Sequence, residues 1–376
     1  MMQTDDRVAG GPARPRRPRA GVAARTAIGL DFGTTNSSVA LAAEVPGEAS
    51  TVELAKYPAM GGLTASFRSL LYFEQLGRSA VRIGLPSGPH CWTGPEAIER
   101  YLAHAERGET DVRGRLIQSL KSYLPSRSLL GTEIFGQRYL LEDLVSRMLR
   151  DLRLGAERQF GRPIEHAVVG RPVRFAGGVT EEDAAFALER MRRSLELAGF
   201  SRVEFEYEPV AAAYAYGAGL EKQELLLIGD FGGGTSDFSL VRMGRGERTV
   251  VGTSGVGVAG DAFDAKLVRR LVSPALGAES LARSMGKLLP AVPTWIYANL
   301  ERWHYLSFLR TRNVLEILRS ARVRALEPDK IEALLTLIEE DLGYQLHQAV
   351  QRVKYELSQQ EMGRFLFDDG SMELDV

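Results

Sequence analysis

Two copies of one short motif, 199 residues apart, constrain the fold of this chain more than any other feature of its sequence. Residues 31–37 have the sequence Asp-Phe-Gly-Thr-Thr-Asn-Ser, and residues 230–236 have the sequence Asp-Phe-Gly-Gly-Gly-Thr-Ser. Each copy follows a short apolar run, at 28–30 and at 225–228, and each leads into a second apolar run. A polar, glycine-containing turn between two apolar strands predicts a β-hairpin. The sequence therefore predicts an architecture with a duplicated hairpin.

The residue types in these turns are those of a phosphate site. Glycines and small hydroxyl residues let backbone N–H groups approach phosphate oxygens and form an anion nest. A carboxylate beside a phosphate would repel it unless a divalent cation intervened, so Asp31 and Asp230 are best explained as holding Mg²⁺ through its water shell. One such hairpin would be an ordinary turn. Two matching copies, each led by Asp, predict a clamp that grips a nucleotide polyphosphate from both sides.

Several other classes of protein are excluded. The chain contains no G-x-x-x-x-G-K-[ST] sequence, and no G-x-G-x-x-G opens a helix after a strand, so neither a P-loop nor a dinucleotide-binding unit is expected. A net charge of -1 provides no basic field for nucleic acid. No apolar run reaches the length of a membrane span. The single cysteine, Cys91, permits no intramolecular disulfide and is typical of a reducing compartment, so we expect a cytoplasmic protein.

Strands that alternate with helices place the chain in the α/β class. Thr180 can cap a helix that Gly199 ends. The apolar face of residues 328–357 predicts one long packed helix, with a coiled coil as the alternative. Residues 1–26 are rich in Arg, Pro and Ala and predict a disordered tail. The other expected elements are helices at 141–160, 180–198 and 211–216 and strands at 167–170 and 203–207.

Four segments resemble motifs of the 70-kDa heat-shock (DnaK-type) chaperone family. Residues 28–40 (IGLDFGTTNSSVA) and 229–241 (GDFGGGTSDFSLV) resemble its two phosphate motifs. Residues 207–217 (YEPVAAAYAYG) are similar to its connecting motif. Residues 254–268 (SGVGVAGDAFDAKLV) resemble its Gly-Gly-x-x-Phe-Asp segment, with Ala259 in place of the first glycine. The resemblance implies an α/β, actin-like and ribonuclease-H-like duplicated ATPase fold, with the nucleotide cleft between two lobes.

The resemblance also implies roles for individual residues. Thr235 would lie near the γ-phosphate, and Glu208 and Asp237 would organise metal and water. Residues 116–124 (LIQSLKSYL) resemble the segment that carries the family's water-orienting lysine, which nominates Lys121. The residues expected to contact nucleotide are Asp31, Gly33, Thr34, Thr35 and Asn36 of the first hairpin, Gly232, Gly233, Gly234 and Thr235 of the second, and Gly260.

The resemblance weakens after about residue 271. Residues 272–327 differ from the usual family insert. In this respect the chain is similar to a subgroup of stand-alone, ATPase-only relatives. Residues 351–358 (QRVKYELS) are similar to the helix that flanks the adenosine, which nominates Lys354 and Ser358 and suggests a stacking role for Tyr355.

No counterpart of the family's later glycine-rich adenosine turn follows. We therefore expect lobe I at 27–221 and a truncated lobe II at 222–376, with exposed apolar edges, an adenine pocket open on one side, low stability and weak nucleotide affinity.

The implied function is a chaperone-like protein that binds Mg-ATP, hydrolyses it weakly and uses it to switch lobe closure, with hinges near Gly170 and Gly217. The expected partners are nucleotide and client proteins or co-chaperones, without nucleic acid or membrane, and the expected state is a monomer. One alternative is a small-molecule kinase of the same fold, which would need an added carboxylate base. The other is a nonhydrolytic scaffold that senses nucleotide.

Overall fold

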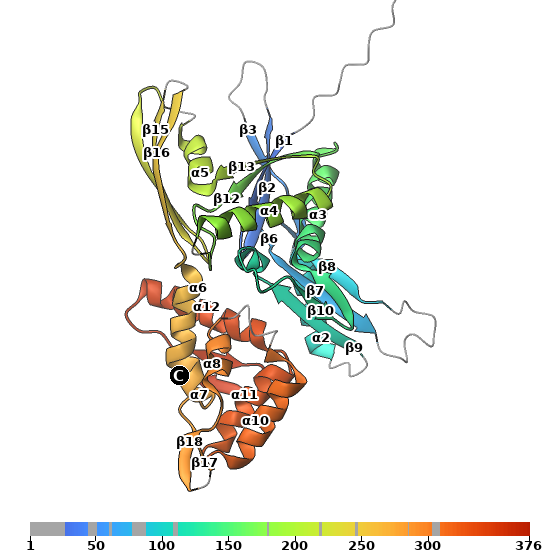
Figure 1. The fold of residues 1–376 in the computed structure, drawn as a ribbon, viewed down its shortest axis with the longest axis vertical. Coiled ribbons are helices and arrows are strands. Elements are labelled where there is room, and N and C mark those ends of the chain that lie inside the picture. The colour runs from blue at the N-terminus through green and yellow to red at the C-terminus, as the bar shows by residue number, and fades with distance from the viewer. Residues whose placement is uncertain are drawn as a thin grey trace, which may run out of the picture.

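The computed structural model describes residues 27–43, 51–59, 62–76, 88–107, 112–178, 180–217, 220–244, 247–284, 286–302 and 309–376. The predicted tail at 1–26 lies outside the described residues. Figure 1 shows an α/β part drawn in blue and green, a long antiparallel sheet drawn in yellow, and a largely helical part drawn in orange and red.

The first lobe is built on a mixed sheet. Its strand order is β13 (Arg202–Tyr207), β12 (His166–Arg171), β1 (Ala27–Phe32), β2 (Asn36–Ala43) and β3 (Thr51–Leu54), and β6 (Phe67–Arg68) also pairs with β2. The strands β1, β12 and β13 are parallel, whereas β2 is antiparallel to β1 and to β3. Helices α3 (Leu141–Phe160) and α4 (Glu181–Leu197) lie on one face of this sheet (Figure 1), and the apolar side chains of β1 are buried in the same core.

A second, smaller sheet extends the first lobe. It has the order β8 (His90–Thr93), β7 (Leu70–Leu76) and β9 (Val112–Gln118), and helix α2 (Gly94–Arg107) follows β8. A single turn of 3₁₀ helix, η1 (Leu120–Tyr123), comes just after β9. The remaining elements of this lobe are the hairpins β4 (Tyr57–Ala59) with β5 (Gly62–Thr64) and β10 (Gly131–Ile134) with β11 (Gln137–Leu140), and helix α5 (Glu208–Gly217).

The predicted second hairpin is present and repeats the first in register. Strands β14 (Glu224–Phe231), β15 (Ser236–Gly244) and β16 (Glu247–Val256) form an antiparallel sheet. Asp31 lies opposite Ser38 in the first hairpin, and Asp230 lies opposite Asp237 in the second. The four residue pairs of the first hairpin all recur in the second, shifted by 199 positions, which confirms the duplication.

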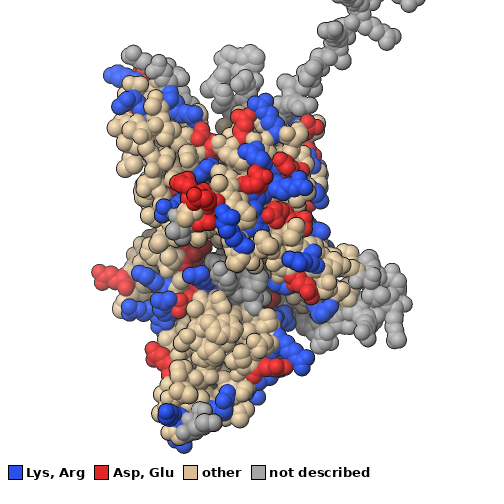
Figure 2. All heavy atoms as spheres, viewed as in Figure 1, with Lys and Arg blue, Asp and Glu red and all other residues tan. Residues whose placement is uncertain are grey.

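The two copies differ in what covers them. In the first copy, β1 pairs with β12 along the edge that does not pair with β2, and Ile28 and Phe32 are fully buried. The equivalent residues of the second copy, Leu227 and Phe231, are 73% and 71% exposed. Among the described residues, β14 pairs only with β15, and Figure 2 shows few charged side chains over β15 and β16 on the face in view. This confirms the expectation of an exposed apolar edge in the second lobe.

The rest of the chain forms a helical body with its own apolar core. It begins with α6 (Gly260–Leu267), which continues through a π-helical turn, η2 (Val268–Val272), into α7 (Ser273–Ala275). It also contains two short hairpins, β17 (Leu281–Ser284) with β18 (Lys287–Pro290) and β19 (Leu366–Asp368) with β20 (Glu373–Asp375). Its other helices are α8 (Thr294–Leu300), α10 (Arg312–Arg324), α11 (Pro328–Glu339) and α12 (Gly343–Gln359), and side chains from all of them meet in one buried cluster.

Most of the predicted elements are confirmed. Helix α3 spans the predicted residues, and α4 begins after Thr180, whose hydroxyl accepts a hydrogen bond from the amide of Asp183 in a capping box. Helix α5 begins at Glu208, three residues earlier than expected. The prediction of one helix over 328–357 is wrong: Asp341 has a φ of 57°, and this left-handed residue separates α11 from α12. The division into lobes at residue 221 stays a prediction. Helix α5 packs through Val210 and Ala213 on the sheet formed by β14, β15 and β16.

The duplication supplies a matched pair of stability variants. We predict that Ile28→Ala, at a buried position of β1, lowers the free energy of unfolding by about 2–5 kcal/mol. Leu227→Ala, at the equivalent exposed position of β14, is expected to change it by less than about 0.5 kcal/mol. Urea denaturation of both variants measures the difference. A similar loss for both would show that the face of β14 is covered in solution.

Candidate functional site

The tips of the two hairpins face each other. A β-carbon built on Gly233 would lie 3.0 Å from the hydroxyl of Thr35, and one built on Gly234 would lie 3.5 Å from the hydroxyl of Thr34. Within the first tip, a β-carbon on Gly33 would lie 2.1 Å from the carbonyl oxygen of Asn36, so only glycine fits there. The two glycine- and threonine-rich turns therefore lie close to each other.

A buried ion pair lies beside the clamp. The ammonium of Lys121 is 2.6 Å from Oε1 of Glu208, and the two side chains are 8% and 14% exposed. Lys121 belongs to η1, and Glu208 is the first residue of α5. A β-carbon on Gly170 would lie 3.0 Å from Cγ of Glu208, so this glycine allows Glu208 to approach β12. Two residues nominated from separate motifs thus form one pair.

The turn that carries Lys121 begins in an unfavourable conformation. Ser119 has a φ of 55° and a ψ of 33°, is fully buried, and has a hydroxyl without a hydrogen-bond partner among the described residues. A residue other than glycine in the left-handed region costs on the order of 1–2 kcal/mol. Such conformations persist where the surrounding structure imposes them, and they cluster at functional sites.

Carboxylates outnumber the lysine at this point. Burial raises the pKa of Asp31 above its usual range; Lys121 opposes this shift in pKa, and the charges of Glu208 and Asp230 add to it. Burial also raises the pKa of Asp230, with further contributions from Glu208 and Asp237. Three or more carboxylates that repel one another around a single ammonium favour an additional cation.

Asp237 connects the second hairpin to the first lobe. Its Oδ1 accepts hydrogen bonds from the amides of Val173 (3.0 Å) and Arg174 (3.3 Å), which follow β12. Burial raises the pKa of Asp237, and the hydrogen bond with the Thr235 side chain opposes that shift. A β-carbon on Gly255 would lie 2.3 Å from the same Oδ1, so glycine is needed opposite the carboxylate.

A cavity of about 600 Å³ opens next to the hairpin tips. All four residues that join α6 to the second hairpin tip line this cavity: the N–H groups of Gly260 and Asp261 donate to the carbonyls of Gly232 and Gly233. The predicted residues that line it are Thr35, Asn36, Gly232, Gly233, Gly260 and Lys354. Its volume and its mixed polar lining are those of a small-molecule site.

Comparison with known protein families matches residues 120–282 to the Hsp70 protein family. This stretch contains Lys121, Glu208, the whole second hairpin and the start of α6. The match supports an Hsp70-type ATPase domain over these residues. It also supports the actin-like ATPase fold and a chaperone-like, ATP-binding protein. The first hairpin lies outside the matched residues, and its identical register ties it to the second.

The three α12 residues nominated for the adenosine differ in whether they line the cavity. Lys354 lines the cavity, 2.7 Å from Oδ1 of Asp264. Ser358 does not line it: its side chain is exposed, and its hydroxyl donates to the carbonyl of Tyr355. Tyr355 is also absent from the lining, so the expected stack on adenine has no support in this geometry. Both residues lie beyond the stretch of α12 that faces the hairpins.

Sequence reasoning missed two cavity residues on α12, His347 and Gln351. They lie seven and three residues before the nominated Lys354 and share its face of the helix, and that spacing was the available signal. Gln351 donates a hydrogen bond to Asp264. Asp264 closes the Phe-Asp segment that the sequence identified without assigning it a role; burial raises its pKa, and Lys354 counters the rise.

Contacts also cross the mouth of the cavity. The ring of Tyr101 in α2 meets that of Tyr344 in α12 edge to face, with 5.8 Å between centroids. The Tyr101 hydroxyl donates to Gln345 and to the carbonyl of Asp341. Elsewhere, burial raises the pKa of Cys91 to about 12, which argues against a nucleophilic thiol. Among the described residues, no helix combines the length and apolarity that crossing a membrane requires.

The link through Asp237 can be tested with two glycines of one strand. We predict that Gly255→Ala displaces the Asp237 carboxylate, leaves the amides of Val173 and Arg174 unpaired, and lowers the free energy of unfolding by about 1–3 kcal/mol. Gly252→Ala, in the same strand with no heavy atom within 4 Å of the new β-carbon, is the control, with an expected change below about 0.5 kcal/mol. Denaturant melts give both values, and equal losses would contradict the assignment.

Proposed function

We propose that this chain binds Mg-ATP with its polyphosphate between the two hairpin tips and hydrolyses it slowly to ADP and phosphate. One observation carries the proposal: the buried Lys121–Glu208 pair lies with Asp31 and Asp230 at the point where the two duplicated turns meet. The phosphate contacts would come from Gly33, Thr34, Thr35, Asn36 and residues 232–235, and the nucleoside would occupy the adjoining cavity beside Gly260 and Lys354.

Magnesium fits the residues present. Carboxylate oxygens are the protein groups that Mg²⁺ prefers, and it usually keeps several of its waters. Among the described residues, no three His, Cys, Asp or Glu side chains are grouped so as to coordinate a metal directly. Asp31 and Asp230 would therefore hold the ion through water, and the bound ion would neutralise phosphate charge.

In the proposed hydrolysis, water attacks the γ-phosphorus, the bond from that phosphorus to the bridging oxygen of ADP breaks, and the water proton is released. A lysine ammonium has three donors and no acceptor, so Lys121 orients the water and stabilises negative charge rather than acting as a base. Glu208 holds the ammonium in place and can accept a hydrogen bond from the water. Thr235 would contact the γ-phosphate, and Asp237 would fix the second turn.

We place the coupling to lobe movement at Asp237 rather than at glycine hinges. Close packing accounts for both predicted hinge glycines: a β-carbon on Gly170 would crowd Glu208, and one on Gly217 would lie 1.8 Å from the sulfur of Met243. In contrast, Asp237 belongs to the second hairpin and holds backbone of the first lobe. A phosphate that shifts the second turn would act on this link.

The catalytic role of Lys121 gives the direct test of the proposal. We predict that Lys121→Ala lowers kcat for ATP hydrolysis by about 100-fold, because one preorganised donor is lost from the transition state. Calorimetric affinity for Mg-ADP should stay within about threefold, because the lysine acts on the water. Lys222→Ala is the matched control, since Lys222 precedes β14 at the end of the strand opposite Asp230, on the order of 20 Å away.

Two outcomes would overturn the proposal. Turnover of Lys121→Ala at the wild-type rate would remove Lys121 from the reaction. Absence of Mg-ADP binding by the folded wild-type chain would remove the nucleotide site itself, whereas binding without turnover would favour the nonhydrolytic scaffold.

A further inference from the structure

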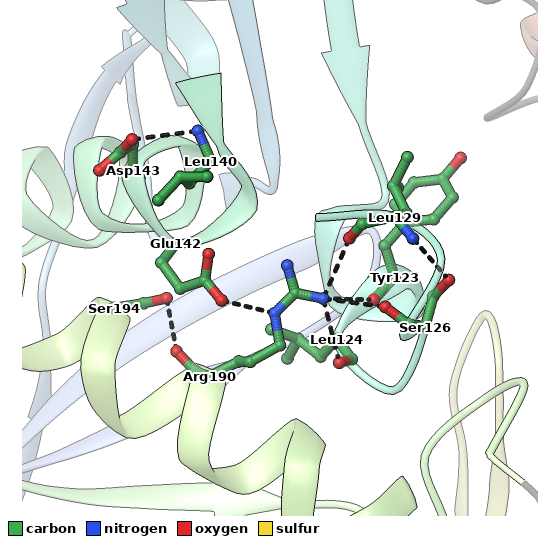
Figure 3. A network of polar contacts seen from close by, with 9 residues as sticks. All are labelled: Tyr123, Leu124, Ser126, Leu129, Leu140, Glu142, Asp143, Arg190 and Ser194. Carbon is green, nitrogen blue, oxygen red and sulfur yellow. Dashed lines mark hydrogen bonds and ion pairs between the residues drawn. The ribbon is translucent and has the colours of Figure 1, made fainter. Parts of the chain in front are cut away.

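Arg190 is a buried arginine that the proposed reaction does not use. It lies in the middle of α4, is 4% exposed, and its Nε is 2.6 Å from Oε1 of Glu142. Glu142 is held in turn at the start of α3, where the Asp143 carboxylate accepts a hydrogen bond from the amide of Leu140 (Figure 3). The guanidinium is therefore anchored on its helix and by an ion pair to a second helix.

The other side of the guanidinium faces a ring of backbone carbonyls. Nη1 lies within hydrogen-bonding distance of the carbonyl oxygens of Tyr123 (3.4 Å), Leu124 (3.5 Å), Ser126 (3.1 Å) and Leu129 (3.2 Å), as Figure 3 shows. Tyr123 is the last residue of η1, and Leu124, Ser126 and Leu129 belong to the irregular segment that follows it directly. A buried cation surrounded by carbonyl dipoles is a strong constraint on a backbone that has no regular secondary structure.

The turn that carries Lys121 needs such a constraint. It is one turn of 3₁₀ helix, entered through the left-handed Ser119. At its ends, the amide of Ser122 donates to the carbonyl of Ser119, that of Leu124 to Lys121 and that of Ser126 to Tyr123. Short 3₁₀ turns have poor hydrogen-bond geometry and little stability of their own. The guanidinium of Arg190 contacts four backbone carbonyls at the end of this turn and just after it.

We propose that Arg190 is a positioning residue for Lys121: by holding the 123–129 segment from behind, it keeps η1 in the conformation that points the Lys121 ammonium at Glu208. This inference rests on the proposed function, because its catalytic consequence is transmitted through Lys121. It adds a component of the site, in α4, that has no contact with the cavity.

Arg153 is a matched control for the structural cost of losing a buried arginine. Its guanidinium also forms an ion pair, with Glu157, and donates to two backbone carbonyls, those of Ala198 and Ile164. None of these partners belongs to η1 or to residues 123–129. Arg153→Met should therefore lower stability without loosening the Lys121 turn.

The experiment compares Arg190→Met, Arg190→Lys and Arg153→Met by hydrogen exchange of peptides covering residues 119–130 and by ATP turnover. We expect both Arg190 variants to exchange faster in this segment, by about tenfold or more for Met and less for Lys, which keeps the charge but has fewer directed donors. We expect kcat to fall by about tenfold to 100-fold for Arg190→Met, with partial rescue in Arg190→Lys and unchanged affinity for Mg-ADP. Arg153→Met should match wild type in both readouts.

The double variant Lys121→Ala/Arg190→Met separates a positioning role from general loss of stability. If Arg190 acts through Lys121, the double variant has the same kcat as Lys121→Ala alone. Multiplied losses, or unchanged exchange of residues 119–130 in a folded Arg190→Lys, would overturn the inference while the proposed function stands. Wild-type turnover of Lys121→Ala would overturn the proposed function, and with it the claim that Arg190 acts through this lysine.

Discussion

The crowding of carboxylates around Lys121 is the constraint on which the rest of this site depends. Asp31, Glu208 and Asp230 come from three separate elements. Burial raises the pKa of Asp31 and of Asp230, and the charge of Glu208 adds to both shifts. One buried ammonium offsets part of that repulsion, and removing one partner of such a buried pair typically costs about 3–5 kcal/mol. The features around it serve this arrangement: the left-handed Ser119 that starts the lysine turn and the missing side chain at Gly170 that admits Glu208.

The duplication provides two similar hairpin tips that lie close together. The two hairpins differ in how much of the protein packs against them. In the first, β12 and the helices α3 and α4 bury the apolar side of β1, so the clamp has a rigid support. In the second, Leu227 and Phe231 remain exposed, and the described contacts that steady the hairpin come from α5, from α6 and from the amides that hold Asp237. The second hairpin thus has less packing behind it than the first, which suits the proposed response to phosphate.

Local and repeated signals allowed much of this fold to be predicted. The matching turns predicted both hairpins and their register, and Thr180 predicted the start of α4. The break at Asp341 was missed because the buried apolar face continues from α11 into α12, so periodicity alone does not register the turn. Lys354 and Ser358 were both nominated for the nucleotide, and only Lys354 lines the cavity, since the point at which a helix leaves a cleft depends on tertiary packing. Arg190 resembles a surface residue of an amphipathic helix in sequence, and only the folded chain shows the carbonyls around it.

The central claim is that both hairpins bind the same polyphosphate. An amide NMR titration of the folded chain with Mg-ADP, followed at Gly33 and Gly233, tests it most directly. The two signals are predicted to shift together and to fit a single dissociation constant, because one ligand would contact both tips. A shift at one hairpin alone, or at neither, would contradict the two-sided clamp.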